Sequence, residues 1–292
     1  MVCPNKIYLR KEKCFTESCQ YGGESLERLY NTWYGRVLSK FILLPVFSTI
    51  ATSGDRKRSS VGKIAPFIVE YKIYMDDFED REYTSFSDFF TRKIKPGRRP
   101  VDPDPSAVIS PADSKVLCYD IGDDLKFMVK GSVYTPGEIV GNRIDLSGFA
   151  GGKCLVFRLS MDDYHHYCHI DSGKVSDSYE IKGKLHTVSS ISSKYKIYKE
   201  NHRIVNILDT DHFGRVIYIE VGALLVGRIK NNGITVFEKG QEKGYFEQGG
   251  STIVVFFEKD QIKVDGDILE MSGNGIESEV RMGERIGVKG NA

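Results

Sequence analysis

The feature that most limits the fold of this chain is a series of short apolar or alternating runs that starts near residue 107. The runs are separated by Gly, Asp, Asn and Ser, and they lie at 115–121, 126–133, 153–160, 214–229, 233–240 and 251–265. Short runs with turn-forming residues between them are typical of β-strands. The sequence therefore predicts a predominantly antiparallel β body, arranged as a sandwich or a barrel.

The first hundred residues show the periodicity of helices instead. Between Glu24 and Leu44 the apolar side chains recur at steps of three and one, which places them on one helical face, and Pro45 ends the pattern. A second helix is predicted around 63–73, and the closely spaced prolines between residues 96 and 105 require an extended path there. The expected fold is α+β, with an N-terminal helical segment followed by the β body.

A basic, glycine-containing loop from Thr52 to Lys63 marks the expected domain boundary. It separates an N-terminal segment, residues 1–60, from a main domain, residues 61–292. The amphipathic helix of the first segment has two interpretations. It docks on its own domain, as most such helices do, or it lies in a membrane surface with Trp33 near the lipid headgroups. Composition alone does not choose between them.

The charge balance and the cysteines exclude several classes of function. The 41 lysines and arginines nearly balance the 40 aspartates and glutamates, so no broad basic face is expected to attract nucleic acid. The charged N-terminus has no apolar core of the kind found in secretory signals, and no uncharged apolar run reaches the roughly 18 residues of a spanning helix. The six cysteines show no CxxC spacing, which argues for reduced thiols and against a zinc site.

Three stretches hold side chains that are suited to chemistry. "SPADSKV" places Asp113 in a turn before a strand, where an aspartate is usually only a turn former. "DDYHHYCHIDSG" brings together His165, His166 and His169, for which a metal site, a solvated turn and an acid–base role all stay open. "EQGGSTIVVFF" places Ser251 between a glycine pair and an apolar run.

The GGST stretch by itself indicates only a glycine-assisted turn into a strand. It is not a phosphate-binding loop, because no lysine follows the second glycine and a strand comes next instead of a helix. It is not a GxSxG nucleophile elbow either, because no second glycine follows Ser251.

The order of these stretches is more specific than any one of them. "FFTRKIKPGRRP", "SPADSKV", "DDYHHYCHIDSG", "KLHTV", "NHRIV", "VGALLVGRI" and "KGQEKGYFEQGGSTIVVFF" follow one another as in the proenzymes of the phosphatidylserine decarboxylase family. The chain resembles this family from about Tyr30 to Gly287.

The resemblance implies that the chain cuts itself between Gly250 and Ser251. The products would be a large chain of residues 1–250 and a small chain of residues 251–292. In this chemistry the Ser251 hydroxyl attacks the Gly250 carbonyl to form an ester, and elimination and loss of ammonia then leave a covalent pyruvoyl group in place of the serine. The resemblance also implies that Asp113, His165 and Ser251 act together.

The same resemblance implies a substrate and a cofactor. The pyruvoyl group derived from Ser251 would form a Schiff base with phosphatidylserine and act as an electron sink, so that CO2 and phosphatidylethanolamine are released. The expected partners are this membrane phospholipid and the two chains of the proenzyme, with no metal and no nucleic acid. A homodimer is left open.

Two residues depart from the family pattern. Ser114 replaces the glycine of "SP(A/C)DG", which requires that the backbone at this position is not left-handed. Cys168 stands where a second histidine often follows the first, since "YHRxH" becomes "YHHYC". Either His165 serves both self-cleavage and decarboxylation, or His169 is an alternative base one residue further along.

A two-chain phospholipid substrate favours the membrane interpretation of the 24–44 helix, because extracting such a lipid from the bilayer is costly. We therefore expect a peripheral enzyme on the cytoplasmic face of the cell membrane. Two alternatives compete with this reading: a pyruvoyl-dependent decarboxylase of a small soluble amino acid, and an uncleaved, catalytically inactive lipid-binding homologue.

Overall fold

A computed structural model describes residues 5–18, 53–129, 132–183, 200–222, 229–247 and 251–290. The helix predicted at 24–44 and the glycine pair before Ser251 lie outside these residues.

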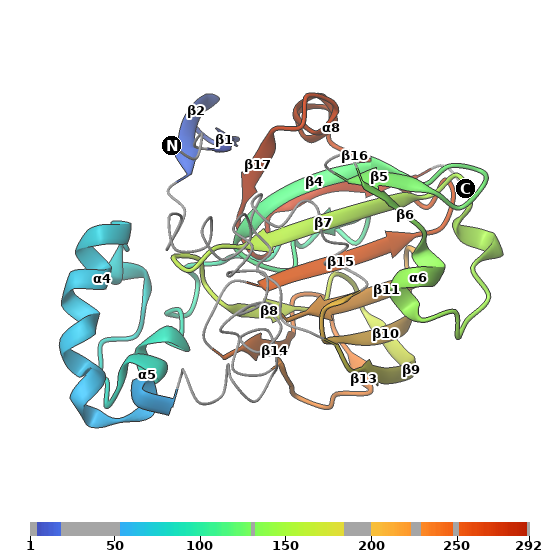
Figure 1. Ribbon diagram of the computed structural model, residues 1–292. Coiled ribbons are helices and arrows are strands. Elements are labelled where there is room, and N and C mark those ends of the chain that lie inside the picture. Colours follow the sequence, from blue (N-terminus) through green and yellow to red (C-terminus); the bar gives the residue numbers. More distant parts are fainter. Residues whose placement is uncertain are drawn as a thin grey trace, which may run out of the picture.

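A large sheet of ten strands forms the centre of the molecule (Figure 1), in the order β13-β9-β10-β11-β15-β7-β4-β17-β1-β2. All its neighbouring strands are antiparallel except β1 and β17, which run parallel. In chain order the strands are β1 (Asn5–Leu9), β2 (Cys14–Ser18), β4 (Ser114–Asp120), β7 (Lys153–Leu159), β9 (Gly173–Ile181), β10 (Arg203–Thr210), β11 (Gly214–Val221), β13 (Val236–Phe237), β15 (Ser251–Phe257) and β17 (Glu277–Val280).

Smaller sheets complete the β structure. One has the order β12-β14-β8 and another the order β16-β18-β3, while β5 pairs with β6 in an antiparallel two-stranded sheet. Their bounds are β3 (Ala107–Ile109), β5 (Phe127–Val129), β6 (Ser132–Tyr134), β8 (His166–Cys168), β12 (Ile229–Asn231), β14 (Glu242–Phe246), β16 (Ile262–Val264) and β18 (Arg285–Lys289).

The described helices are short. The α-helices are α4 (Ile64–Tyr71), α5 (Phe86–Phe90), α6 (Pro136–Val140) and α8 (Gly266–Gly273), and the 3-10 helices are η1 (Gly54–Arg56), η2 (Arg58–Lys63), η3 (Met75–Asp77) and η4 (Ser147–Phe149). Helix α4 confirms the helix predicted around 63–73, and residues 96–105 are free of helix as the prolines required.

The β body predicted from the alternating runs is confirmed, and the fold is α+β. The large sheet stays open, because among the described residues its two ends, β13 and β2, pair with nothing further in that sheet. It therefore does not close into a barrel. The division of the chain at residue 60 remains a prediction.

Strand β15 is the longest of the described strands in which every residue is buried. All seven of its residues are buried, and it lies between β11 and β7 near the middle of the large sheet. A strand covered on both faces needs apolar side chains on both, which explains why its sequence is a continuous apolar run instead of an alternating one. This burial fixes the place of Ser251, the first residue of the strand.

Helices α4 and α5 stand beside the sheet and share a separate aromatic core (Figure 1), which contains Phe67, Phe86, Phe89 and Phe90. Helix α5 begins at a side-chain cap, because the Ser85 hydroxyl accepts a hydrogen bond of 3.1 Å from the Asp88 amide. At the other end of the helix, the ring centroids of Phe90 and His165 lie 4.4 Å apart. The helical part of the chain thus reaches the region of the predicted site.

Candidate active site

Ser251 begins β15, and its register partner in β7 is Leu159. Its hydroxyl is buried and has no hydrogen-bond partner within the described part of the chain. A buried hydroxyl without a partner costs about 1–3 kcal/mol, and such groups in native proteins often mark a catalytic role. The surroundings of the Ser251 hydroxyl are consistent with a reactive serine.

Asp113 lies in the bend that precedes β4, where it is 8% exposed. Its carboxylate accepts hydrogen bonds from Arg99, at 2.9 and 3.0 Å from Nε and 2.7 Å from Nη2, and one of 2.8 Å from the Met282 amide. Arg99 also pairs with Asp77 at 2.9 Å. Burial disfavours the charged guanidinium, but the two carboxylates outweigh burial and raise the pKa of Arg99. Asp113 is thus held by a bidentate ion pair.

His165 is fully buried at the entry to β8. Its Nδ1 lies 2.9 Å from the carbonyl oxygen of Asp163. A carbonyl oxygen can only accept a hydrogen bond, so Nδ1 must carry the proton. In the neutral ring, the basic nitrogen is then Nε2.

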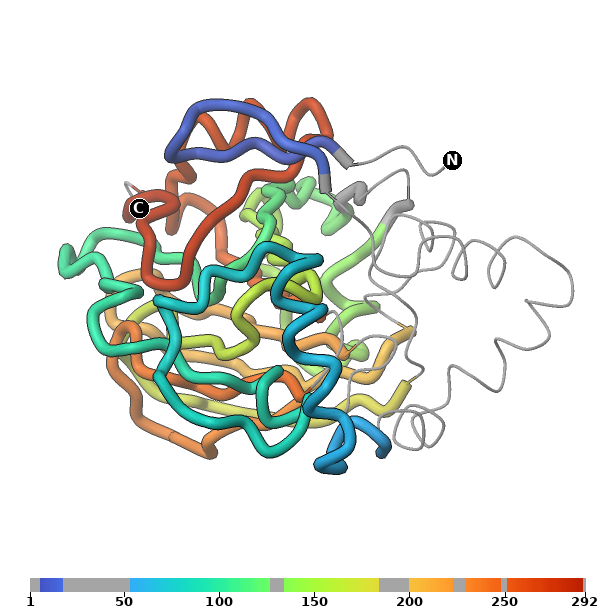
Figure 2. The backbone as a smooth tube through the Cα atoms, turned by 90° about the vertical axis from the view of Figure 1, so that its left-hand side faces the viewer, coloured from blue at the N-terminus to red at the C-terminus, as the bar shows by residue number. Residues whose placement is uncertain are grey.

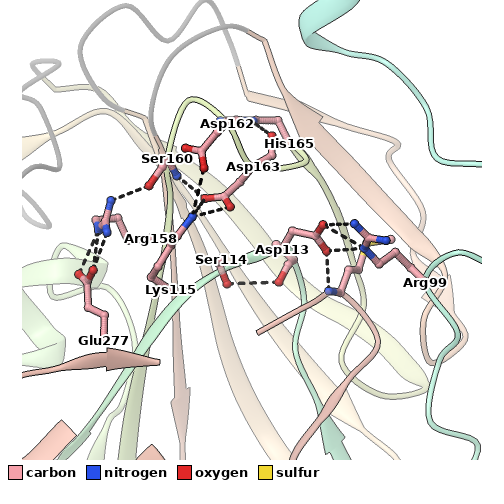
Figure 3. A network of polar contacts seen from close by, with 12 residues as sticks. Arg99, Asp113, Ser114, Lys115, Arg158, Ser160, Asp162, Asp163, His165 and Glu277 are labelled. Carbon is pink, nitrogen blue, oxygen red and sulfur yellow. Dashed lines mark hydrogen bonds and ion pairs between the residues drawn. The ribbon is translucent and has the colours of Figure 1, made fainter. Parts of the chain in front are cut away.

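The three residues that the resemblance brings together have different partners in Figure 3. Asp113 lies against Arg99, whereas His165 contacts the Asp163 backbone. The expected contact between Asp113 and His165 is not among those of the described residues. The joint role of Asp113, His165 and Ser251 remains a proposal.

The other two histidines of the cluster have separate surroundings. His166 stacks between Tyr164 and Tyr245, and its Nδ1 is 3.1 Å from Glu242. His169 stacks on Phe237 with 3.8 Å between ring centroids, and burial, with a smaller effect of Lys243, lowers its pKa to about 3. Within the described ranges, no three His, Cys, Asp or Glu side chains are grouped to hold a metal ion.

Both departures from the family pattern can be located. Ser114 is the first residue of β4 and does not have a left-handed backbone, so the condition for losing the glycine is met. Cys168 is buried in β8, where its amide donates to the Pro111 carbonyl at 2.9 Å. Burial and the nearby Asp113 carboxylate raise the pKa of its thiol to about 12. The residue in the place of a second histidine therefore lies near Asp113 and stays a neutral thiol.

Sequence reasoning missed a buried polar network beside His165 (Figure 3). Lys115 Nζ lies 2.6 and 2.8 Å from the two carboxylate oxygens of Asp163. Next to this pair, Arg158 Nε lies 3.0 and 3.1 Å from the carboxylate of Glu277. Burial raises the pKa of Asp163 to about 7 against the opposing effect of Lys115. The available signal was a lysine and an arginine within runs that otherwise predicted buried strands.

Comparison with known proteins agrees with the motif order. The family model described as phosphatidylserine decarboxylase matches residues 86–288. The chain is 53% identical over 270 residues to phosphatidylserine decarboxylase proenzyme 2 of Clostridium acetobutylicum, covering 92% of this chain and 93% of that protein. It is 37% identical to a phosphatidylserine decarboxylase proenzyme of Clostridium novyi, covering 97% and 99%, and 36% identical to one of Desulfitobacterium hafniense, covering 97% and 98%.

Proposed function

The chain belongs to the phosphatidylserine decarboxylase family, and we propose that it cuts itself before Ser251 and then converts phosphatidylserine to phosphatidylethanolamine and CO2. The observation that carries this proposal is the Ser251 hydroxyl, which is buried and without a partner in the described residues at the start of a central strand. Most buried hydroxyls in native proteins have a hydrogen-bond partner, so a buried serine hydroxyl without one among the described residues is a candidate for a chemical role.

The first part of the proposal is self-cleavage. A serine hydroxyl becomes a useful nucleophile when a base takes its proton, and in His165 the basic nitrogen would be Nε2, since Nδ1 donates to the Asp163 carbonyl. The Ser251 oxygen would attack the Gly250 carbonyl, break the C–N bond and form an ester. Removal of the Ser251 α-proton would then expel the ester oxygen as the Gly250 carboxylate, and hydrolysis would release ammonia.

The residue left at position 251 would be the pyruvoyl cofactor. When formed, this group supplies a ketone that binds the substrate amine as a Schiff base and accepts the electron pair left by the departing CO2. The buried position of residue 251 suits this chemistry, because a site that excludes water protects the reacting carbon from stray protons. His165 would hold the proton that the substrate carbon takes up after CO2 has left.

A third part of the proposal is the place of action. No helix in the described ranges is long and apolar enough to span a membrane. We propose that the enzyme acts as a peripheral protein on the cytoplasmic face of the cell membrane, and that the amphipathic stretch at 24–44 provides the contact. The support is the pattern of its apolar residues together with the phospholipid named for the relatives.

A denaturing gel with intact-mass measurement tests the cleavage. The expected result is two fragments divided before Ser251, with the smaller fragment carrying an N-terminal pyruvoyl group. Ser251→Ala should stay whole, and His165→Ala should be slower by about 10²–10⁴, the usual contribution of a positioned acid–base group. A wild-type chain of full mass would contradict the proposal.

An assay of the purified enzyme on two substrates tests the reaction. Phosphatidylserine in vesicles should lose CO2 and give phosphatidylethanolamine, whereas a water-soluble phosphoserine ester without acyl chains should react slowly. Faster turnover of the soluble compound would favour a decarboxylase of small molecules instead.

A further inference from the structure

We propose that Lys115 and Asp163 are positioning residues that fix the tautomer of His165 through the peptide carbonyl of Asp163. The effect on catalysis rests on the proposed function, in which His165 takes the proton of the Ser251 hydroxyl. The structural part does not depend on the reaction and can be measured in an uncleaved chain.

The first observation is the turn that leads from β7 into β8. The Asp163 amide donates to the Ser160 carbonyl at 3.1 Å, and the Ser160 amide donates to the Asp163 carboxylate at 2.6 Å. These two hydrogen bonds close the turn in both directions. The turn therefore holds the backbone and the side chain of Asp163, the residue whose carbonyl oxygen contacts His165 Nδ1.

The second observation is that a charge from the neighbouring strand clamps the turn. Lys115 comes from β4 and contacts both oxygens of the Asp163 carboxylate. The two side chains are only 6% and 11% exposed. Because a buried charge is costly without its partner, any movement of the turn that separates this pair is strongly disfavoured.

A second ion pair supports the other end of the turn. Arg158 pairs with Glu277 of β17 and donates a hydrogen bond of 2.8 Å from Nη1 to the Ser160 hydroxyl. The remaining carboxylate nearby, Asp162, lies 3.8 Å from Lys115 Nζ. The turn is thus held by side chains from β4, β7 and β17, which are neighbouring strands of the large sheet.

The consequence for His165 is a choice between its two ring nitrogens. The carbonyl of Asp163 accepts the proton on Nδ1, so Nε2 keeps its lone pair. In serine hydrolases, a histidine in the wrong tautomer lowers turnover by about 10⁴. An aspartate side chain usually sets this tautomer there, but Asp113 here is held by Arg99. We infer that a peptide carbonyl does the same job in this chain.

Nitrogen NMR of the histidine ring tests the structural part. Ser251→Ala protein with 15N-labelled histidine keeps the chain whole, and the His165 signals are assigned by their loss in a His165→Gln variant. Long-range proton–nitrogen spectra should show His165 with Nδ1 protonated and Nε2 unprotonated. Lys115→Met should give a mixture of tautomers. A proton on Nε2 in the parent protein, or an unchanged pure tautomer in Lys115→Met, would overturn the proposal.

A control variant tests whether the loss of any lysine between β4 and β7 shifts the tautomer. Lys153 and Asp120 pair across the same two strands at the opposite end of β7 and β4. Lys153→Met should leave both the His165 tautomer and self-cleavage unchanged. A shift of the tautomer in this control equal to that in Lys115→Met would show a general effect on the sheet and would count against the proposal.

Self-cleavage rates in chains that retain Ser251 test whether Lys115 and Asp163 affect the reaction through His165. Lys115→Met removes the cation that holds the Asp163 carboxyl group in place and should slow cleavage by at least about tenfold, towards the 10⁴ that a fully wrong tautomer costs. The double variant Lys115→Met/Asp163→Asn removes both charges but keeps an oxygen for the Ser160 amide, so it should recover part of the rate. A double variant as slow as, or slower than, Lys115→Met would contradict a positioning role.

The two hypotheses fail in different ways. If His165→Ala cleaved as fast as the parent, the role of His165 in the proposed function would fall while the tautomer measurement still stood. If the tautomer did not depend on Lys115 although His165→Ala was inactive, only the positioning role would fall.

Discussion

Arg99 and Arg98 are adjacent arginines with very different surroundings. Arg99 is 9% exposed in its side chain and holds both Asp113 and Asp77, whereas Arg98 is 50% exposed and lies 3.7 Å from Asp77. Arginine is suited to the buried position because its planar guanidinium matches a carboxylate with two parallel hydrogen bonds. The structure therefore assigns to one residue of the "GRRP" stretch the task of holding the predicted acid.

Arg99→Gln should destabilise the protein, because it leaves the Asp113 carboxylate buried without its counter-charge. The expected loss in unfolding free energy is about 3 kcal/mol, the lower end of the range for breaking a buried ion pair. Urea unfolding in the Ser251→Ala background, which avoids a two-chain transition, gives the value.

Arg98→Gln is the matched control, since an exposed ion pair contributes about 0–1 kcal/mol. Equal losses of unfolding free energy in the two variants would show that the buried Arg99 contacts stabilise the protein no more than the exposed Arg98 contact does.

At the scale of elements, the strands were predictable because their signals are local. The apolar runs and the turn residues between them located β4, β7, β11, β15 and β16, and the helix at 63–73 appeared as α4. The partners of the site residues were not predictable in this way. Asp113 meets Arg99 across a loop, and Lys115 meets Asp163 only because β4 pairs with β7. Strand order depends on non-local pairing, which one sequence does not reveal.

The helix predicted at 24–44 carries a testable expectation of its own. Trp33→Glu with Phe41→Glu puts two charges on its apolar face, and flotation with anionic liposomes should fall several-fold, because a charge in the acyl region opposes insertion. Thr32→Glu with Ser39→Glu adds the same charge to the polar face and should float much more like the parent. Equal flotation of the apolar-face variant and the parent would argue against membrane contact through this face.

At the scale of the whole molecule, the residues after Ser251 are interleaved with those before it. Strand β15 lies between β11 and β7, β17 lies between β4 and β1, and β18 pairs with β3. Figure 2 shows the N-terminal hairpin β1–β2 beside the C-terminal part of the chain. There, Arg10 lies 2.8 Å from both Asp265 and Asp267 and 2.9 Å from Glu284. The proposed cut would separate two chains that share one sheet.

The cleaved protein should accordingly behave as one particle. Size-exclusion chromatography without denaturant should give a single peak that contains both fragments and elutes with the uncleaved Ser251→Ala chain, whereas urea should separate the fragments. Elution of the small fragment by itself in native buffer would contradict this expectation.

The central position of β15 also affects when Ser251 can react and whether the enzyme can refold after cleavage. Its neighbours β11 and β7 precede it in the chain, so Ser251 takes its place in the sheet only after the 250 residues before it have been synthesised. Refolding before the cut is a unimolecular event, whereas afterwards two fragments must find each other without the effective concentration that a covalent link provides. Before the cut, the unfolded protein would refold at a rate that does not depend on its concentration. After the cut, refolding would slow as the two fragments are diluted.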